Sequence, residues 1–431
     1  MLYVIFSNDI FIIVIFIIVV SYILFVLYLK CKMPFWSKQP VFHIYDLMYW
    51  LKPPGLITMD MPLLNKYVDL INIKTVSLSE ENDLLMTTMC QFIKNNYMAR
   101  KDVSGTSYLP SKSNIIEYLT SSNHASYITL YQQPKILFDK NVPETCIDEV
   151  LAVITARPLY IRINKGKNKT MFPLYYVDNL CVHPGHRKKN IASTMIQTHY
   201  YNLRRQNKNI HTCLFKREGT LNAIVPLVVF NTYGVTINSM TNANATNAIG
   251  TNATNAIGPN DTNDTNAIGP SLKLIEIGIT QLPLLVDFIK ENTIKHFTCV
   301  ILPDVTNLMN LIKTNNLVIY AFLKEGVIIA CYIFRLTEFI YAGQKTADCI
   351  MMLSAKINTD IFSIGFAMAC STLQKKHKVE LVLIEDTAHA HIITAKLLAI
   401  DYKFAFISPT AFFLYNYVTY SIKKLDFLII Y

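Results

Sequence analysis

The chain has 431 residues, of which 52% are hydrophobic, and its formal net charge is +10. This length allows two or three domains or one large duplicated fold, and the hydrophobic content excludes a chain that is disordered overall. The positive charge predicts an anionic partner, with nucleic acid, a membrane surface and coenzyme A as the candidates. Nucleic acid ranks last, because the sequence has no zinc-finger spacing, no long basic run and no aromatic motif of an RNA-binding domain.

The nine cysteines are scattered along the chain and form no C-x-x-C pair. An odd number of cysteines without close spacing predicts reduced thiols in a cytosolic compartment. It disfavours both a disulfide scaffold and a zinc site, so we predict no metal ligands.

The first predicted element is a transmembrane helix near the N-terminus. Residues 10–29 contain no charged side chain, and a helix of that length would be about 30 Å long, enough to cross the hydrocarbon core of a bilayer. A cleaved signal peptide is disfavoured, because no basic residue precedes the run and no small-residue cleavage site follows it. Lysines follow the run and Asp9 precedes it, so the positive-inside rule places residues 30–431 in the cytosol. The sequence therefore predicts a single-pass membrane protein, anchored by residues 1–32, with a cytosolic body.

Three further stretches of the first half predict packing elements. Residues 33–41 read MPFWSKQPV, and an aromatic pair beside Gln-Pro-Val predicts an extended segment that packs on a domain. Residues 80–98 predict a helix, and its apolar face would consist of Leu84, Leu85, Met89 and Phe92. Residues 150–163 are rich in β-branched side chains and predict two strands broken at Pro158.

The stretch from Tyr175 to Leu203 is the one around which the chain is organised. Its first part, to Val182, is mostly apolar and predicts a buried strand, which turns at residues 183–185. The turn presents three basic side chains, Arg187, Lys188 and Lys189. A helix follows, with one face formed by Ile191, Met195, Ile196, His199 and Leu203. The free first-turn amides and the dipole of such a helix favour a phosphate, although an ordinary strand-turn-helix with a solvated basic turn fits the spacing equally well.

This stretch resembles known acyltransferases. The motif V-x-P-x-x-R, from Val182 to Arg187 ahead of a helix, resembles the acyl-CoA pyrophosphate loop of the GNAT superfamily. Residues 179–193 are similar to the longer signature FLCVH...R.K..AP of eukaryotic N-myristoyltransferases. Two departures are Asn179, where that family has Phe, and Ser193, where it has Pro.

Other segments resemble the same family, in the same order along the chain. Residues 33–41 are similar to the FW.TQPV segment that starts the family's catalytic core and lies over the bound acyl-CoA. Residues 95–97 are similar to N.NYV, and residues 150–163 to the strand pair LVGFISAIPANIHI that leads into the signature. Residues 376–417 resemble the corresponding C-terminal segment.

The resemblance implies that myristoyl-CoA is a co-substrate and that no cofactor is bound permanently. The residues implied to bind it are Pro34, Phe35, Trp36, Asn179, Leu180, Cys181, Val182, Arg187, Lys188, Lys189, Asn190, Ile191 and Ala192. In acyl transfer the thioester carbonyl becomes an oxyanion, which each backbone N–H donor stabilises by about 3–4 kcal/mol. The resemblance assigns this role to the amides of Asn179 and Leu180.

The base is also implied by the resemblance. In the family the C-terminal carboxylate accepts a proton from the substrate's glycine amine, and the matching group here belongs to Tyr431. An α-amine has a pKa of about 8, so a nearby carboxylate suffices to help supply the neutral nucleophile. The last residues are mostly apolar, and a terminal strand that docks without chemistry is the alternative.

Residues 241–270 repeat the theme TNATNAIG. Such a low-complexity tract has little to bury and predicts a solvated linker. Its N-x-T sequons begin at Asn244, Asn252, Asn260 and Asn263. They would be glycosylated in a lumen and left unmodified in the cytosol.

After the linker the pattern alternates again between helices and strands. Helices are predicted over residues 281–291, 363–375 and 387–399, and strands over residues 317–323, 327–335, 379–384 and 412–420. Asp386 and His389 are predicted to have capping and surface roles. Residues 225–235 and 407–409 lack the family's aromatic-His run and its acidic GDG, so peptide recognition is the least supported part of the resemblance.

Together these features predict an α/β (α+β) protein with two pseudo-symmetric GNAT-like halves, mixed sheets flanked by helices, and one N-terminal transmembrane helix. Residues 33–240 would bind acyl-CoA, and residues 271–431 would bind the peptide and supply the C-terminal carboxylate. The predicted function is direct transfer of myristate to the N-terminal glycine amine of proteins. Two alternatives stay open: a GNAT acyltransferase with another acyl donor or amine acceptor, and a catalytically degenerate protein that binds acyl-CoA at the membrane.

Overall fold

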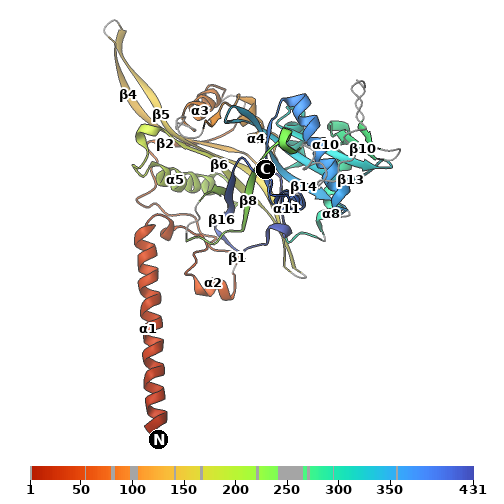
Figure 1. The fold of residues 1–431 in the computed structure, drawn as a ribbon. Coiled ribbons are helices and arrows are strands. Elements are labelled where there is room, and N and C mark those ends of the chain that lie inside the picture. Colours follow the sequence, from red (N-terminus) through yellow and green to blue (C-terminus); the bar gives the residue numbers. More distant parts are fainter. Residues whose placement is uncertain are drawn as a thin grey trace.

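A computed structural model describes the chain as a mixed α/β body from which one long helix projects (Figure 1). The described residues are 2–53, 55–78, 83–97, 105–139, 142–165, 168–219, 223–240, 266–268, 272–294, 296–355 and 358–431. Of the predicted linker at 241–270, only β9 (Asn266–Ile268) is described, so the sequons lie outside the described residues, as do residues 80 and 98 at the ends of the predicted helix.

The projecting helix is α1 (Leu2–Lys32), which leaves the body as a single rod (Figure 1). Its segment Ile10–Lys32 is long and apolar enough, by length and composition, to cross a membrane. Residues 10–25 are exposed, and near its C-terminal end Leu29 packs with Tyr45 of the body. The predicted apolar helix is therefore present, and most of its apolar surface is left uncovered by the body.

The two halves of the body contain helices and strands in the same order. The first half runs through β2 (Ile73–Ser77), α3 (Asp83–Asn96), α4 (Ser113–Leu119), β4 (Tyr127–Asp139), β5 (Val142–Lys165), β6 (Asn168–Val182), α5 (Ile191–Gln206) and β7 (Cys213–Glu218). The second half runs through β10 (Leu272–Glu276), α8 (Leu282–Ile294), α9 (Val305–Lys313), β12 (Leu317–Lys324), β13 (Val327–Tyr341), β14 (Gln344–Ser354), α10 (Thr359–His377) and β15 (Leu381–Glu385). In both halves the middle strands are antiparallel, and the strand after the long helix is parallel to the strand before it. The predicted pair of pseudo-symmetric halves is confirmed.

The two halves exchange their next strands. β8 (Val228–Thr236) follows β7 in the chain but pairs with β15 of the second half. β16 (Ile407–Tyr415) follows the second half but lies between β7 and β8. β11 (Cys299–Leu302) and β18 (Phe427–Ile429) extend the sheet beyond β5. One mixed sheet therefore runs through both halves, and its main path has the order β18-β11-β5-β6-β7-β16-β8-β15-β14-β13-β12-β10-β9. Beside this path, β4 pairs with β5 and β2, and β3 (Ser107–Tyr108) pairs with β13.

Helices cover both faces of the sheet, because successive strand residues point to opposite faces. In β5, Val153 packs with α3 and α4, whereas its neighbours Ala152 and Ile154 pack with α5. The second half follows the same rule, with α10 on one face of β12 and β13 and with α8 and α9 on the other. Shorter described elements are η1 (Trp36–Lys38), α2 (Leu47–Leu51), β1 (Gly55–Leu56), β3 (Ser107–Tyr108), η3 (Pro184–His186), α6 (Ile237–Met240), η5 (Ile279–Gln281), α11 (Ala390–Ala399), β17 (Tyr417–Val418) and η6 (Lys424–Asp426).

The predicted apolar face of α3 was partly wrong. Leu84 is 82% exposed. The buried face consists of Met86, Met89, Cys90, Phe92 and Ile93. The buried face therefore keeps Met89 and Phe92 of the predicted set and turns Leu84 to the outside.

The predicted break at Pro158 was also wrong, because β5 runs through it. Along one edge of β5, Ala156 pairs with β4 and Tyr160 pairs with β11. Pro158 lies between these two residues and pairs only with Tyr175 on the other edge. Proline lacks a backbone N–H. The missing donor is tolerated here, because Pro158 lies in the gap between the end of the pairing with β4 and the start of the pairing with β11.

Three other expectations differ from the structure. Residues 36–38 form a 3-10 turn instead of a fully extended segment. Asp386 is buried and paired with Lys424, so it has no surface role. His389 is half-buried at the N-cap position of α11, but its Nδ1 accepts the N–H of Ser354 at 2.9 Å instead of capping the helix.

β11, α9 and β14 were not predicted. β11 and β14 are buried on both faces and so lack an alternating pattern. α9 is amphipathic, with Leu308, Leu311 and Ile312 buried, and its helical period was missed.

Candidate active site

The candidate site is centred on a bulge in β6. Between Val153 and Thr155 of β5, one residue faces two residues of β6, Asn179 and Leu180. Asn179 has a φ of 55°, a left-handed conformation that Asn adopts more readily than most residues. On the other edge, the pairing of β6 with β7 ends at Val177. The bulged residues therefore have no register partner among the described strands.

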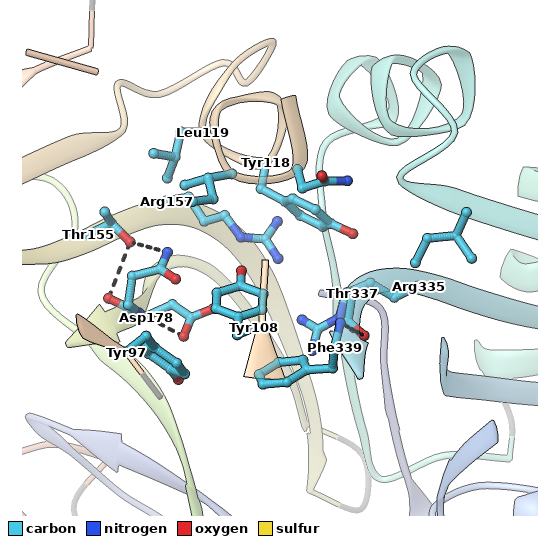
Figure 2. A pocket seen from close by; sticks show the side chains of 14 residues that line it. Tyr97, Tyr108, Tyr118, Leu119, Thr155, Arg157, Asp178, Arg335, Thr337 and Phe339 are labelled. Atoms are coloured by element: carbon cyan, nitrogen blue, oxygen red, sulfur yellow. Dashed lines mark hydrogen bonds between the residues drawn. The ribbon is translucent and has the colours of Figure 1, made fainter. Parts of the chain in front are cut away.

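Side chains around the bulge hold it in place. Asn179 donates from Nδ2 to Thr155 Oγ1 at 3.0 Å, and the Thr155 hydroxyl donates to the Asp178 carbonyl at 3.2 Å (Figure 2). The Asp178 carboxylate accepts the backbone N–H of Asn179 at 2.8 Å. Of the two amides predicted to bind an oxyanion, that of Asn179 is thus already bonded, whereas Leu180 has no register partner on β5.

An apolar cavity of about 290 Å³ lies on one side of the bulge. Side chains from β5, β6, β7 and α5 line it, among them Ile154, Val177, Phe215 and Ile196, and the residues of the bulge close one part of its wall. His199 of α5 also lines it, with Nδ1 at 2.7 Å from Thr129 Oγ1. Burial lowers the pKa of His199 to about 3, so its imidazole is neutral near pH 7.

A polar cavity of about 100 Å³ lies on the other side of the bulge (Figure 2). Its polar wall carries the hydroxyls of Tyr97, Tyr108 and Tyr118 and the guanidinium groups of Arg157 and Arg335. Burial raises the pKa of Tyr118 to about 12, so this phenol stays protonated near neutral pH. The two cavities share three lining residues, Tyr97, Asp178 and Asn179. Asp178 and Asn179 therefore lie in the wall between them.

The segment predicted to cover the acyl-CoA reaches the apolar cavity through Trp36. The Trp36 ring lines the cavity and stacks on Phe215, with ring centroids 5.7 Å apart. Phe35 is buried and packs edge-on against Trp36 and Tyr67, so it anchors the segment. Pro34 is exposed and lines neither cavity.

The basic turn predicted to bind the pyrophosphate lies at the start of α5. Arg187, Lys188, Lys189 and Asn190 are exposed there, and the first turn of α5 has no acidic side chain. Arg187 also ties the turn down, because its guanidinium donates to the carbonyl oxygens of Val182 and Asn96. The same helix lines the apolar cavity farther along, so α5 connects the basic turn to that cavity.

Four residues of the predicted acyl-CoA set are buried or half-buried and do not offer free side chains. Cys181 and Ile191 are buried in the packing of β6 and α5. Val182 packs beside Ile191. Ala192 is half-buried at the first turn of α5. Any contact of these buried positions with a ligand would come from their backbone, and their side chains shape the turn.

Tyr431 lies at the centre of the molecule, where the C end of the chain is drawn in Figure 1. Its hydroxyl bonds to Glu385 and accepts from Lys216 Nζ at 3.0 Å, and Lys216 also donates to Glu385 at 2.8 Å. Burial lowers the pKa of Lys216, but the Glu385 carboxylate raises it and the net shift is well upward. The Arg335 guanidinium lies 4.7 Å from the centroid of the Tyr431 ring.

Tyr431 lines neither cavity, although two of its neighbours do. Lys216 lines the apolar cavity and Arg335 lines the polar one. Tyr431 is therefore connected to the two cavities indirectly, by its contacts with Lys216 and Arg335. The predicted role of its carboxylate stays a prediction.

The sequence analysis did not single out Asp178, Arg157, Arg335 or Lys216. Asp178, Arg157 and Arg335 lie in strands whose neighbouring residues are mostly apolar, whereas Lys216 precedes Arg217 and Glu218 in β7. A charged residue inside such a strand was the available signal, because a charge is rarely buried without a partner or a function. In the described part of the chain, no group of three or more His, Cys, Asp or Glu side chains could hold a metal ion.

The fold is similar to that of solved N-myristoyltransferases of Saccharomyces cerevisiae. One structure, with bound myristoyl-CoA, matches with a TM-score of 0.63 at 15% sequence identity, over 91% of this chain and 90% of that chain. Another, solved with myristoyl-CoA and inhibitors, matches with a TM-score of 0.60 at 15% identity, over 92% of this chain and 94% of that chain. No protein-family profile and no curated protein matches the sequence. The chain thus has the N-myristoyltransferase fold, which confirms at the level of the fold the resemblance seen in the motifs.

Proposed function

We propose that this chain, built on the N-myristoyltransferase fold, is an acyltransferase that moves myristate from myristoyl-CoA to the N-terminal glycine amine of a peptide or protein. The observation that carries the proposal is the bulge at Asn179 and Leu180, in the wall between an apolar and a polar cavity. Acyl transfer between two substrates requires such a place, because the thioester and the amine must approach one point from opposite sides.

The donor would occupy the side of the apolar cavity. Burial of each methylene of an acyl chain there stabilises the complex by about 0.8 kcal/mol. The diphosphate of CoA would lie at the basic turn, where Lys188 and Lys189 are exposed beside the free amides at the start of α5. Trp36 would contact the acyl part of the donor, because it lines the apolar cavity.

The reaction would proceed by direct attack. The amine nitrogen forms a bond to the thioester carbon, and the electron pair of the carbonyl moves to its oxygen, which the amides at the bulge would hold. Collapse of this intermediate breaks the C–S bond, and the CoA thiolate leaves and takes up a proton. The proton of the amine passes to a carboxylate.

Two carboxylates are candidates for that proton. Asp178 lines both cavities and accepts the N–H of Asn179. If the incoming ammonium group draws Asp178 away, the same movement frees the Asn179 amide for the oxyanion. The terminal carboxylate of Tyr431 is the other candidate, since its side chain is fixed beside Lys216 and Arg335. We favour Asp178, because it lines the cavities themselves.

The membrane would be the third partner. We propose that α1 anchors the protein as a single-pass helix and that the body lies in the cytosol, with no role for nucleic acid. The lysines that follow the apolar run support this orientation. Expression in cells that glycosylate tests it, since the sequons at 244–265 would then stay unmodified. A glycosidase-sensitive shift in mobility would place the body in the lumen.

The second candidate function is a protein that binds acyl-CoA without turnover. The observation in its favour is the bond between Asp178 and the Asn179 amide, which occupies one of the two oxyanion donors. In this alternative Asp178 would keep that position when acyl-CoA binds, and no amine would be acylated.

Transfer of the acyl group to peptides decides between the two functions. The full-length chain in detergent micelles is mixed with myristoyl-CoA and peptides that begin with glycine, and CoA release and peptide mass are followed. We expect acylation of the free amine and none of the same peptide after N-acetylation. Tight binding of myristoyl-CoA without transfer to any amine would overturn the proposal. A chain that lacks residues 430–431 tests the contribution of the terminal carboxylate.

A further inference from the structure

The polar cavity contains a buried guanidinium that forms no ion pair with any carboxylate of the described residues. Arg157 is 4% exposed, and its Nη1 makes no hydrogen bond. In the described part of the chain, no carboxylate forms an ion pair with it. Figure 2 shows its guanidinium between Tyr118 and Tyr108, directed into the space that the lining residues enclose.

Aromatic rings surround the guanidinium group of Arg157. The guanidinium carbon of Arg157 lies 5.0 Å from the centroid of the Tyr118 ring and 5.4 Å from that of Tyr176. Such cation–π contacts recover part of the lost hydration, but they leave the hydrogen-bond donors of the guanidinium unsatisfied. Arginine stays protonated in proteins, so the charge persists. A buried charge without a partner destabilises the fold unless a ligand completes the site.

The second arginine of the cavity differs, because its charge is already matched. Arg335 pairs with Asp348 at 2.7 Å. Arg157 makes no such close ion pair among the described residues, although the field of the Asp178 carboxylate reaches it across the cavity. Asp178 lies in the wall of the same cavity. Its carboxylate accepts the N–H of Asn179 and has further lone pairs that can accept from an ammonium group. The cavity thus presents one positive and one negative group to whatever enters it.

From this arrangement we infer that the polar cavity recognises an acyl acceptor that carries a carboxylate close to its reacting amine, with the carboxylate bound by Arg157 and the amine by Asp178. The inference rests on the proposed acyl transfer and names the acceptor class of the same site. A guanidinium holds a carboxylate through two parallel hydrogen bonds, which suits the open donors of Arg157. The cavity volume of about 100 Å³ keeps the acid group within one or two residues of the amine.

Two sources could supply this carboxylate. One is the α-carboxylate of a free amino acid, and the other is an acidic side chain at the second position of a peptide. The first is tested by comparing glycine with glycinamide, and the second by comparing Gly-Asp-Ala amide with Gly-Asn-Ala amide. We expect kcat/KM with myristoyl-CoA to be about tenfold higher, or more, for the acid-bearing member of one pair. The pair that responds identifies the source.

Substitutions at Arg157 test whether this residue causes the preference. In Arg157→Met, kcat/KM should fall at least about tenfold more for the acid-bearing acceptor than for the neutral one. Arg157→Lys keeps the charge but not the paired donors, so it should retain only part of the preference. Arg162→Met is the matched control: Arg162 lies in the same strand, also has unpaired nitrogens, and lines neither cavity. This control should keep the preference.

The outcomes separate this inference from the proposed function. Equal kcat/KM within both pairs, or a preference that survives in Arg157→Met, overturns the inference and leaves acyl transfer standing. If no amine is acylated, the proposed function fails, and binding then decides. In that case the acid-bearing acceptor should raise the melting temperature of the natural chain but not of Arg157→Met, and no shift in either overturns the inference. Without ligand, Arg157→Met should melt no lower than the natural chain, because an unpaired buried charge has been removed.

Discussion

The two cavities share a wall and have opposite chemistry. On the apolar side, His199 is held neutral by burial and the ammonium group of Lys216 is paired with Glu385. On the polar side, two guanidinium groups and the tyrosine hydroxyls surround a much smaller space. Adjacent residues of β5 produce this difference, since Ile154 lines the apolar cavity and Thr155 lines the polar one. Because successive side chains of β5 point to opposite faces of the sheet, this strand separates the proposed acyl-chain cavity from the proposed amine cavity.

The comparison also shows why the bulge matters. A regular sheet would keep the two cavities apart, because its backbone amides are bonded to neighbouring strands. At Asn179 and Leu180 the register is broken on both edges. The wall can therefore offer N–H donors to a group that spans it. The predictions below test each side of this wall in turn.

The largest effect is expected from Asp178→Asn, which removes the carboxylate from the wall. We expect kcat to fall about 100-fold near pH 6.5, as is typical when a general base is lost. The loss should shrink above pH 8, because the α-amine, with a pKa of about 8, then deprotonates in solution. The binding constant of myristoyl-CoA should not change. A pH profile of kcat for both proteins provides the measurement.

Asp401→Asn is the matched control for that substitution. Asp401 is exposed and has a φ of 52°, a conformation similar to that of Asn179, and it lines neither cavity. Its substitution should leave the pH profile unchanged. If Asp178→Asn lowered kcat equally at every pH, its role would be structural. If kcat did not change, Tyr431 would remain as the base.

A smaller effect is expected from Ile196→Trp, which fills part of the apolar cavity from α5. Loss of space for two or three methylenes corresponds to about 2 kcal/mol, or more than tenfold in the dissociation constant of myristoyl-CoA. Shorter acyl-CoA esters should lose less, so the preferred chain becomes shorter. Isothermal titration with acyl chains of several lengths measures this. Ile71→Trp is the control, because Ile71 is 86% exposed. Equal weakening at all chain lengths would contradict the assignment of the cavity.

The smallest effect concerns stability and comes from His199, the neutral histidine of the apolar cavity. Its pKa is about 3 in the folded chain and about 6.5 when unfolded. The unfolded chain therefore binds more protons below pH 6.5, and the free energy of unfolding falls as the pH decreases from 6.5 toward 3. His199 should account for at most about 1.4 kcal/mol per pH unit of this fall. His199→Gln should reduce the slope by that amount.

Urea unfolding at pH 7, 6 and 5 measures the slope for both proteins. His389, with a pKa that burial lowers to about 4, contributes a similar slope over a narrower range. His389→Gln therefore serves as the comparison: each single substitution should remove part of the slope, and the double substitution more. A slope that is the same in His199→Gln and in the natural chain would show that His199 is not held neutral.

Local patterns predicted the elements that carry the proposed donor site. The strand, basic turn and helix between Tyr175 and Leu203 were predicted from periodicity, and the structure has them as β6, the turn and α5. They could be predicted because turn chemistry and helix periodicity act over a few neighbouring residues. The acceptor side could not be predicted in this way. Arg157 and Arg335 come from distant strands, and only the pairing of the sheet places them at one cavity.

Composition and spacing predicted the long apolar helix and the strand-turn-helix, because these patterns require no knowledge of distant contacts. The two repeated halves were implied by the resemblance of the motifs to a known family. Three features depend on the tertiary structure: β8 and β16 exchange halves, β5 passes through Pro158, and Arg157 forms no ion pair among the described residues. The physical reason is that register and burial depend on which strand lies alongside. A shift of one residue would turn each side chain to the other face of the sheet.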